Sequence, residues 1–390
     1  MNNPYMIAAV WMGLAFLAAV IAGRTGLAVA LVEIVIGIVA GNLFDVKTTT
    51  WIDFLAGFGS GLLTFLAGAE IEPSVIRNHW KQTLSIGFVS FLLPFLGAMV
   101  FARWVVGWDM RAAEIAGIAL STTSVAVVYA VMVESGLNET TLGKIILAAC
   151  FVTDFGTVLA LGVLFVHYNW YLLAFILSMA VVLPLAPPLV RLVIRLTGGR
   201  VSEAETKFVL LIMFFLGGVA DAGGSEPILP AYLVGMVLAG TFLRQRPLVV
   251  RLRSIAFTVL TPFYFLRAGT YVVANAVLGG AGLIALLLGV KLATKYIGVR
   301  PLAAVFRMPT REATYTTLLM STGLTFGTIS ALFGLTHGVI NRSQYTILVT
   351  VVILSAFVPT LLAQQFFKPN VQAHLDAQRG PAARAPQQSS

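Results

Sequence analysis

Long apolar runs fill almost the whole chain of 390 residues, and most are long enough to cross a lipid bilayer. Thirteen runs, separated by charged residues or by Gly and Pro, occupy residues 5–22, 27–43, 52–70, 82–106, 112–134, 140–165, 169–195, 205–223, 227–243, 254–274, 277–306, 313–336 and 343–367. A bilayer core needs about 20 apolar residues per helix, so the pattern predicts an all-α protein with about thirteen transmembrane helices. The third and ninth runs are short, and we expect them to tilt or to enter the membrane part-way.

The composition excludes other classes of chain. Hydrophobic residues make up 58% of the sequence and charged residues only 11%, against about 25% charged in a typical soluble domain. So few charges could neither cover a soluble globule nor keep a chain disordered. We therefore expect one transmembrane domain over residues 1–367, followed by a disordered tail over residues 368–390. The first run has no basic segment before it, so we expect it to be retained rather than cleaved as a signal.

The formal net charge of +9 has a topological explanation. If the runs alternate across the membrane from an external N-terminus, eighteen of the 25 Lys and Arg residues fall on the inner side. The outer side holds Lys47, Arg103, Arg111 and Arg342, and three basic residues lie inside runs. Such a bias follows the positive-inside rule, so it predicts an external N-terminus and a cytoplasmic C-terminus. It also removes most of the case for nucleic acid as a partner.

Two polar interruptions point to an internal repeat. Ser121-Thr122-Thr123-Ser124 breaks the fifth run, and a cluster of Ser, Thr and Gly over residues 321–327 breaks the twelfth. The two runs are seven apart, an odd number, so they cross the membrane in opposite directions, with the seventh run as the linker of an inverted repeat. Either cluster alone would be explained by close helix packing. As a matched pair of interrupted helices they favour a transport site near the membrane midplane.

The ionisable residues inside the runs are few, and Asp154 is the most central carboxylate. A charge deep in a bilayer costs roughly 2.5–3.5 kcal/mol, so it marks a functional group unless it is neutralised structurally. Burial disfavours the ionised carboxylate and a nearby cation favours it, so Asp154 could exchange a proton for a metal ion. Thr153 could add a hydroxyl oxygen. Lys295 and Lys291, one turn apart in the eleventh run, are both candidate partners, and the residues alone do not choose between them.

The remaining polar residues suggest which ion would bind. Thr122, Thr123 and Ser124 are the best hydroxyl ligands, and one carboxylate with hydroxyls suits Na⁺ or K⁺ better than a divalent ion. His79, His167, His337 and His374 are too scattered for a metal site, and the single cysteine, Cys150, has apolar neighbours that indicate a packing role. Arg267 in the tenth run and Glu33 in the second are better explained by structural pairing or packing. No cofactor is expected.

These motifs make the chain similar to the cation:proton antiporter-2 family, which includes bacterial Na⁺/H⁺ and K⁺/H⁺ antiporters, over about residues 5–367. Residues 121–125 resemble the unwound crossing helix of that family, and residues 148–156 with Thr153-Asp154 resemble its ion-binding helix. Lys295-Tyr296-Ile297-Gly298 resembles its Lys-x-x-Gly motif. The distance from Lys295 to the Met308–Glu312 segment fits the family without a gap, which favours Lys295 over Lys291 as the partner.

The resemblance implies a transport mechanism. It implies a homodimer in a bacterial inner membrane, a rigid dimerisation subdomain, and a core subdomain that moves like an elevator. Asp154 would bind a monovalent cation, with Na⁺ favoured, or a proton in turn, and Lys295 would be its ion-pair partner. Electrogenic members carry two adjacent aspartates, and Thr153 replaces the first of them here, which predicts electroneutral exchange of one cation for one proton.

Two other transport functions fit the same sequence features. The alternatives are a K⁺/H⁺ antiporter and a symporter of an organic anion, because related folds carry such substrates. An intramembrane enzyme is disfavoured, since the sequence holds neither a Glu-x-x-His pair nor a Gly-x-Ser-x-Gly motif.

Overall fold

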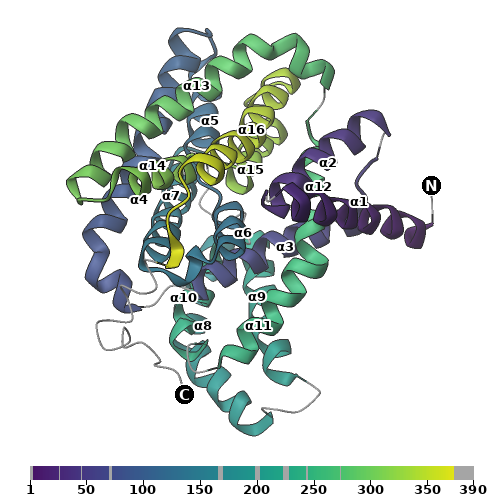
Figure 1. Cartoon of the computed structure of the whole chain (residues 1–390), viewed down its shortest axis with the longest axis vertical. Helices are drawn as coiled ribbons and strands as arrows, with labels where there is room; N and C mark the ends of the chain where they lie inside the picture. Colours follow the sequence, from purple (N-terminus) through teal and green to yellow (C-terminus); the bar gives the residue numbers. More distant parts are fainter. Residues whose placement is uncertain are drawn as a thin grey trace, which may run out of the picture.

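A computed structural model gives the fold, and it describes residues 3–25, 27–44, 46–69, 73–165, 170–197, 203–222, 228–242, 245–272 and 274–372. Within these ranges the regular structure is helical throughout (Figure 1). The tail predicted to be disordered lies almost wholly outside the described residues, as do His167 and His374.

Each of the thirteen predicted runs coincides with one helix or with one broken helix, so the prediction of an all-α membrane fold is confirmed. The helices are α1 (Pro4–Thr25), α2 (Val29–Leu43), α3 (Thr50–Ala69), α4 (Pro73–Trp104), α5 (Met110–Ser121), α6 (Val125–Ser135), α7 (Thr141–Phe165), α8 (Trp170–Thr197), α9 (Ala204–Ala222), α10 (Ile228–Phe242), α11 (Arg246–Ile255), α12 (Thr261–Thr270), α13 (Ala274–Val305), α14 (Thr310–Met320), α15 (Thr325–Thr336) and α16 (Arg342–Phe366), with a 3₁₀ turn η1 (Leu137–Glu139) and a π turn η2 (Ala256–Leu260). The fifth and twelfth runs are broken where the sequence predicts, whereas the π turn in the tenth run is an additional irregularity.

Ten continuous or broken helical stretches of the described chain are long and apolar enough to cross a membrane, and two shorter apolar helices lie at 29–43 and 230–242. The remaining predicted run corresponds to α9, whose ends carry Glu205, Lys207 and Asp221. The third run forms a helix of 20 residues, long enough to span, whereas the ninth remains short at 15 residues.

The helices pack into two bundles (Figure 1). We call α1–α3 with α8–α12 the scaffold bundle, and α4–α7 with α13–α16 the crossed bundle. In Figure 1 the crossed bundle fills the upper left, and the scaffold bundle extends from the right to the bottom. Each bundle draws helices from both halves of the sequence, so neither half folds as a separate unit.

Packing within the bundles repeats between the two halves of the chain. In the scaffold bundle α2 packs on α12 and α3 packs on α10, and in the crossed bundle α4 packs on α5 and α7 while α13 packs on α14 and α16. Gly37 and Gly269 meet where α2 crosses α12, and Gly68 and Gly235 meet where α3 crosses α10. At all four positions a Cβ would overlap a backbone oxygen of the facing helix, so these crossings depend on glycine. The predicted inverted repeat is present.

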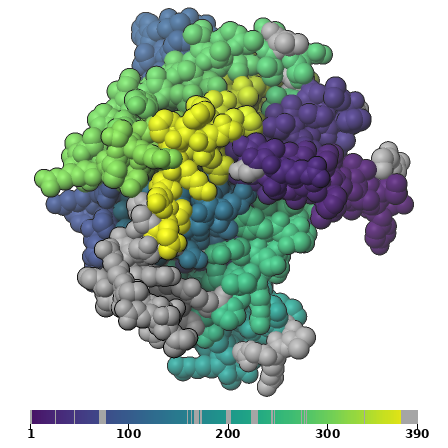
Figure 2. Space-filling view, in the orientation of Figure 1, coloured from purple at the N-terminus to yellow at the C-terminus, as the bar shows by residue number. Residues whose placement is uncertain are grey.

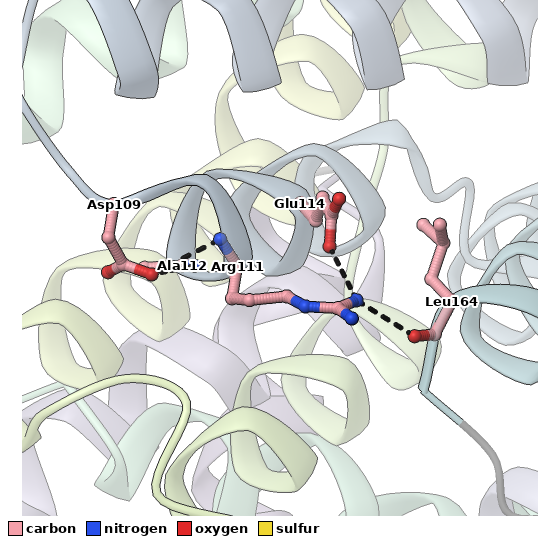
Figure 3. A network of polar contacts seen from close by, with 5 residues as sticks. All are labelled: Asp109, Arg111, Ala112, Glu114 and Leu164. Atoms are coloured by element: carbon pink, nitrogen blue, oxygen red, sulfur yellow. Dashed lines mark hydrogen bonds and ion pairs between the residues drawn. The ribbon is translucent and has the colours of Figure 1, made fainter.

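One end of the crossed bundle is fixed by a polar network (Figure 3). Asp109 precedes α5 and its carboxylate accepts hydrogen bonds from the N–H groups of Arg111 (3.1 Å) and Ala112 (3.3 Å). The Arg111 guanidinium contacts Glu114 at 3.1 Å and donates to the Leu164 carbonyl, 3.0 Å away, near the end of α7. The Asp109 carboxylate thus caps N–H groups that have no partner within the first turn of α5. The Arg111 guanidinium in turn satisfies a carbonyl group that has no partner within the last turn of α7.

We expect Asp109→Ala to destabilise the start of α5 by about 1 kcal/mol, because the capping oxygen is lost. Asp109→Asn should keep the cap and most of the stability. The midpoint of thermal unfolding in detergent measures both variants. If Asn lowers this midpoint as much as Ala does, the contribution comes from the charge of Asp109 rather than from the cap.

A second set of hydrogen bonds joins the two bundles at the start of α2. The Glu134 carboxylate of α6 accepts a hydrogen bond from the Val29 N–H at 3.0 and 3.1 Å, and Gln364 of α16 accepts one from Ala28 at 3.3 Å. Figure 2 shows α16, in yellow, beside the purple N-terminal helices. The alternating topology puts residues 29, 134 and 364 at the same membrane face, so these contacts agree with it.

Candidate functional site

The two interrupted helices cross at the centre of the crossed bundle. Helix α5 ends at Ser121 and α6 begins at Val125, while α14 ends at Met320 and α15 begins at Thr325. The unwound stretches bond to each other: the Ser124 N–H donates to the Thr322 carbonyl (3.0 Å), and the Thr123 hydroxyl donates to the Met320 carbonyl (2.8 Å). Four helix ends therefore meet here, two with partial negative charge and two with partial positive charge.

Lys295 of α13 lies against the first of these breaks. Its side chain is 0% exposed, and its Nζ donates to the Ser121 carbonyl (2.9 Å), Thr123 Oγ1 (2.9 Å) and Ser90 Oγ (2.8 Å). An ammonium group has three N–H donors, so each of them has an acceptor. The lysine charge also lies at the C-terminal end of α5, where the helix dipole favours a cation.

Asp154 of α7 is 4% exposed, and its Oδ1 is buried without a hydrogen-bond partner among the described residues. Lys295 is near enough for its charge to act on this carboxylate. The described ion pairs within 4.0 Å do not include these two residues, because the lysine is held by Ser90 and the first crossing. An unpartnered buried oxygen is costly, so this atom is available for a proton or a cation.

The predicted hydroxyl residues are all buried: Thr122, Thr123 and Ser124 lie in the first break, and Thr153 precedes Asp154 in α7. The Thr153 hydroxyl donates to the carbonyls of Ala149 (3.1 Å) and Gly87 (3.3 Å), and the Thr122 hydroxyl donates to that of Ala119 (3.1 Å). Each hydroxyl oxygen keeps lone pairs that could face a cation. Thr123 differs, because its oxygen already accepts the Lys295 bond.

A second polar cluster joins the crossing to the scaffold bundle, and sequence reasoning missed it. Thr325, at the start of α15, is hydrogen-bonded to Tyr264 of α12, to Ser124 at 3.3 Å and to Ser60 of α3 at 3.5 Å. Ser90 was missed as well. Ser60, Ser90 and Tyr264 are single polar residues within apolar runs, and nothing in their local pattern indicates that they meet the crossing.

Close packing of α4 on α7 positions the carboxylate. A Cβ on Gly87 would lie 2.7 Å from the Ala149 carbonyl, and one on Gly156 would lie 2.8 Å from the Phe91 ring. Both contacts are closer than Cβ atoms tolerate, so the glycines let the two helices approach. This packing keeps Asp154 on α7 and Ser90 on α4 beside the same crossing.

The sequence predicts pairing or packing roles for three further residues, Arg267, Cys150 and Glu33. Arg267 forms an ion pair with Asp53 (Nε to Oδ1, 2.6 Å) and lies over the Tyr271 ring, so the predicted structural pairing is confirmed. Cys150 is buried, as predicted from its neighbours. Glu33 is 2% exposed in the scaffold bundle, and its Oε2 has no hydrogen-bond partner among the described residues. In the described chain, no group of three His, Cys, Asp or Glu residues could hold a metal ion.

The fold and the crossing of the two broken helices together define a class of protein. It is a polytopic membrane protein built as an inverted repeat, in which two broken helices cross beside a buried carboxylate and a buried lysine. The solved structure of the sodium proton antiporter MjNhaP1 from Methanocaldococcus jannaschii shares this fold. Its TM-score is 0.68 at 16% identity, with 94% of this chain and 100% of that chain covered.

Sequence comparison places the chain in a family. The family model described as sodium/hydrogen exchanger, transmembrane, matches residues 12–368. The chain belongs to this family. Probable Na⁺/H⁺ antiporter 3 from Methanocaldococcus jannaschii is 24% identical over 86% of this chain and 88% of that protein. Cation/H⁺ antiporter 18 from Arabidopsis thaliana is 24% identical over 84% of this chain, which spans only 43% of the plant protein.

Proposed function

We propose that the protein exchanges a monovalent cation for protons across a membrane, with Na⁺ favoured over K⁺, and that Asp154 binds the two in turn. The observation that carries this proposal is the buried Oδ1 of Asp154, which has no hydrogen-bond partner among the described residues and lies near Lys295. The names of the relatives, which specify cation/H⁺ and Na⁺/H⁺ antiport, support the substrate class.

Competition at one carboxylate is sufficient for coupling. In the empty site Lys295 pairs with Asp154, an incoming cation displaces that pairing, and protonation of Asp154 then releases the cation. In the arrangement described above, Ser90, Ser121 and Thr123 hold the lysine while Asp154 Oδ1 is unpartnered. These alternative partners of Lys295 support a pairing with Asp154 that can be broken and re-formed. With Thr153 beside a single acid, exchange is one cation for one proton and electroneutral.

The proposal assigns alternating access to the two bundles. The crossed bundle carries Asp154 and moves like an elevator against the scaffold bundle, which forms the interface of a homodimer. The contacts that join them include hydrogen bonds of single side chains, such as Tyr264 with Thr325 and Glu134 with Val29, and these can exchange partners during movement. The location proposed is a bacterial inner membrane, with the N-terminus outside and the C-terminus in the cytoplasm.

The test is a transport assay on purified protein in proteoliposomes that enclose a pH-sensitive dye. A pH gradient should dissipate on addition of Na⁺, and addition of K⁺ or Li⁺ then ranks the cations. An imposed membrane voltage should leave the rate unchanged if exchange is electroneutral. Dissipation driven by organic acids but not by these cations would replace the proposal with anion symport.

The two buried lysines should differ in their effect on pH dependence. Lys295→Ala removes the charge that acts on Asp154 and should shift the pH profile of exchange, because the proton affinity of the carboxylate changes. Lys291→Ala should shift this profile less. Initial rates measured across a series of pH values compare the two variants, and the reverse order would make Lys291 the partner of Asp154.

A further inference from the structure

The second buried lysine, Lys291, has surroundings that the proposed exchange does not use. Its side chain is 0% exposed, and its Nζ donates a hydrogen bond to Ser355 Oγ of α16 at 2.9 Å. The Ser355 hydroxyl in turn donates to the Val352 carbonyl in its own helix at 2.7 Å. Lys291 therefore joins α13 to α16, whereas Lys295 joins α13 to α4 and the first crossing.

The Lys291 Nζ also fills the space that a side chain at Gly323 would need. A Cβ built on Gly323 would overlap the Nζ and would lie 3.0 Å from Ser355 Oγ and 3.2 Å from Thr122 Oγ1. Gly323 is in the break between α14 and α15, and Thr122 is in the break between α5 and α6. Lys291, Ser355 and both unwound stretches therefore meet at one point.

The inverted repeat relates this point to the proposed ion site. Helices α7 (Thr141–Phe165) and α16 (Arg342–Phe366) have equal lengths of 25 residues, and Asp154 and Ser355 occupy the same position in them, thirteen residues after the first. Helices α4 and α13 both have 32 residues, and Ser90 and Lys291 again occupy equivalent positions. The second half thus has Lys291 with Ser355 where the first half has Ser90 with Asp154.

We infer that Lys291, Ser355 and Gly323 form a clamp in which Lys291 is a positioning residue for the proposed cation site. The clamp holds the α14–α15 break against α16. That break supplies the Met320 and Thr322 carbonyls, which accept the bonds from Thr123 and Ser124. The inference rests on the proposed function, because the position of the first crossing matters for exchange only if Asp154 binds the cation there.

The clamp acts on the site through the crossing and not by direct contact with the carboxylate. Lys295 is the lysine whose charge acts on Asp154, and Lys291 is linked to the first crossing through Gly323 and the Met320 and Thr322 carbonyls. Loosening the clamp should therefore weaken cation binding. The rate of the conformational step, which depends on the contacts between the bundles, should be nearly unchanged.

The experiment compares Lys291→Met, which removes the donor, with Ser355→Ala, which removes the acceptor, and with the double variant. We expect each single variant to raise the KM for Na⁺ about fivefold, the consequence of one lost hydrogen bond, with kcat within about twofold of the parent. The double variant should be no worse than either single variant, because both break the same bond. Ser355→Thr keeps the hydroxyl and should restore the parental KM.

A second measurement, the rise in unfolding temperature on adding Na⁺ to purified protein, reports binding without transport. The Na⁺ concentration at half-maximal stabilisation should increase in Lys291→Met and in Ser355→Ala. A parental KM and a parental Na⁺ response in both single variants would overturn the clamp, as would additive effects in the double variant. Failure of the proposed function differs, since the parent protein and Asp154→Asn would then respond identically to Na⁺.

Discussion

Asp154→Asn is expected to abolish exchange, reducing dissipation of the pH gradient to the level of liposomes without protein. Asparagine keeps the shape of the side chain but neither ionises nor takes up a proton in this pH range. The variant therefore loses the charge that attracts the cation and the group that carries the proton. Because the carboxylate is 4% exposed and its Oδ1 is unpartnered among the described residues, loss of its charge should not destabilise the fold.

The control for this prediction is Glu33→Gln. Glu33 is also a buried acid, 2% exposed with an unpartnered Oε2 in the described structure, but it lies in the scaffold bundle away from the crossing. We expect this variant to keep exchange. Thermal unfolding should show both variants folded, with a midpoint for Asp154→Asn equal to or above that of the parent. Normal exchange by folded Asp154→Asn would remove Asp154 from the ion site.

Hydrophobicity made most of the fold predictable. In a bilayer the length of an apolar run sets the length of a helix, because every backbone polar group must be satisfied within the segment. The thirteen runs therefore correspond to helices, and the break at Ser121–Ser124 was predictable because a matching polar cluster interrupts the run seven further on. The π turn at Ala256–Leu260 has no such polar cluster, and the local signal for it is Pro262, which follows it and has no N–H for the Thr258 carbonyl.

Pairing between helices was less predictable, since it depends on contacts that one run does not reveal. The matched interruptions at residues 121–124 and 321–327 predicted the crossing itself. The sequence identified Lys291 and Lys295 as rivals for one aspartate, but in the structure each lysine has its own serine: Ser355 for Lys291 and Ser90 for Lys295. A buried serine in an apolar run has no distinctive local pattern, so this division became visible only once the helices were placed together.

The glycine crossings of the scaffold bundle should be the positions most sensitive to added volume. Gly235→Val places a branched side chain where even a Cβ would overlap the Phe65 carbonyl of α3. A side-chain rotation cannot relieve this overlap, since the overlapping atom belongs to the backbone of α3. Overpacking typically costs 1–3 kcal/mol and more where backbone must move, so we expect little folded protein to accumulate.

Gly240 lies in the same helix and provides the matched control, because a Cβ there meets nothing within 4 Å. We expect Gly240→Val to accumulate as folded protein, because the added side chain occupies open space. Size-exclusion chromatography of the detergent-solubilised protein, with the unfolding midpoint of each variant, measures the difference. The inverted repeat predicts the same result at the other glycine crossing. Gly269→Val, where α2 crosses α12, should also fail to fold, because its Cβ would overlap the Ile34 carbonyl. If Gly235→Val and Gly240→Val behave alike, close approach of α3 and α10 does not hold the scaffold together.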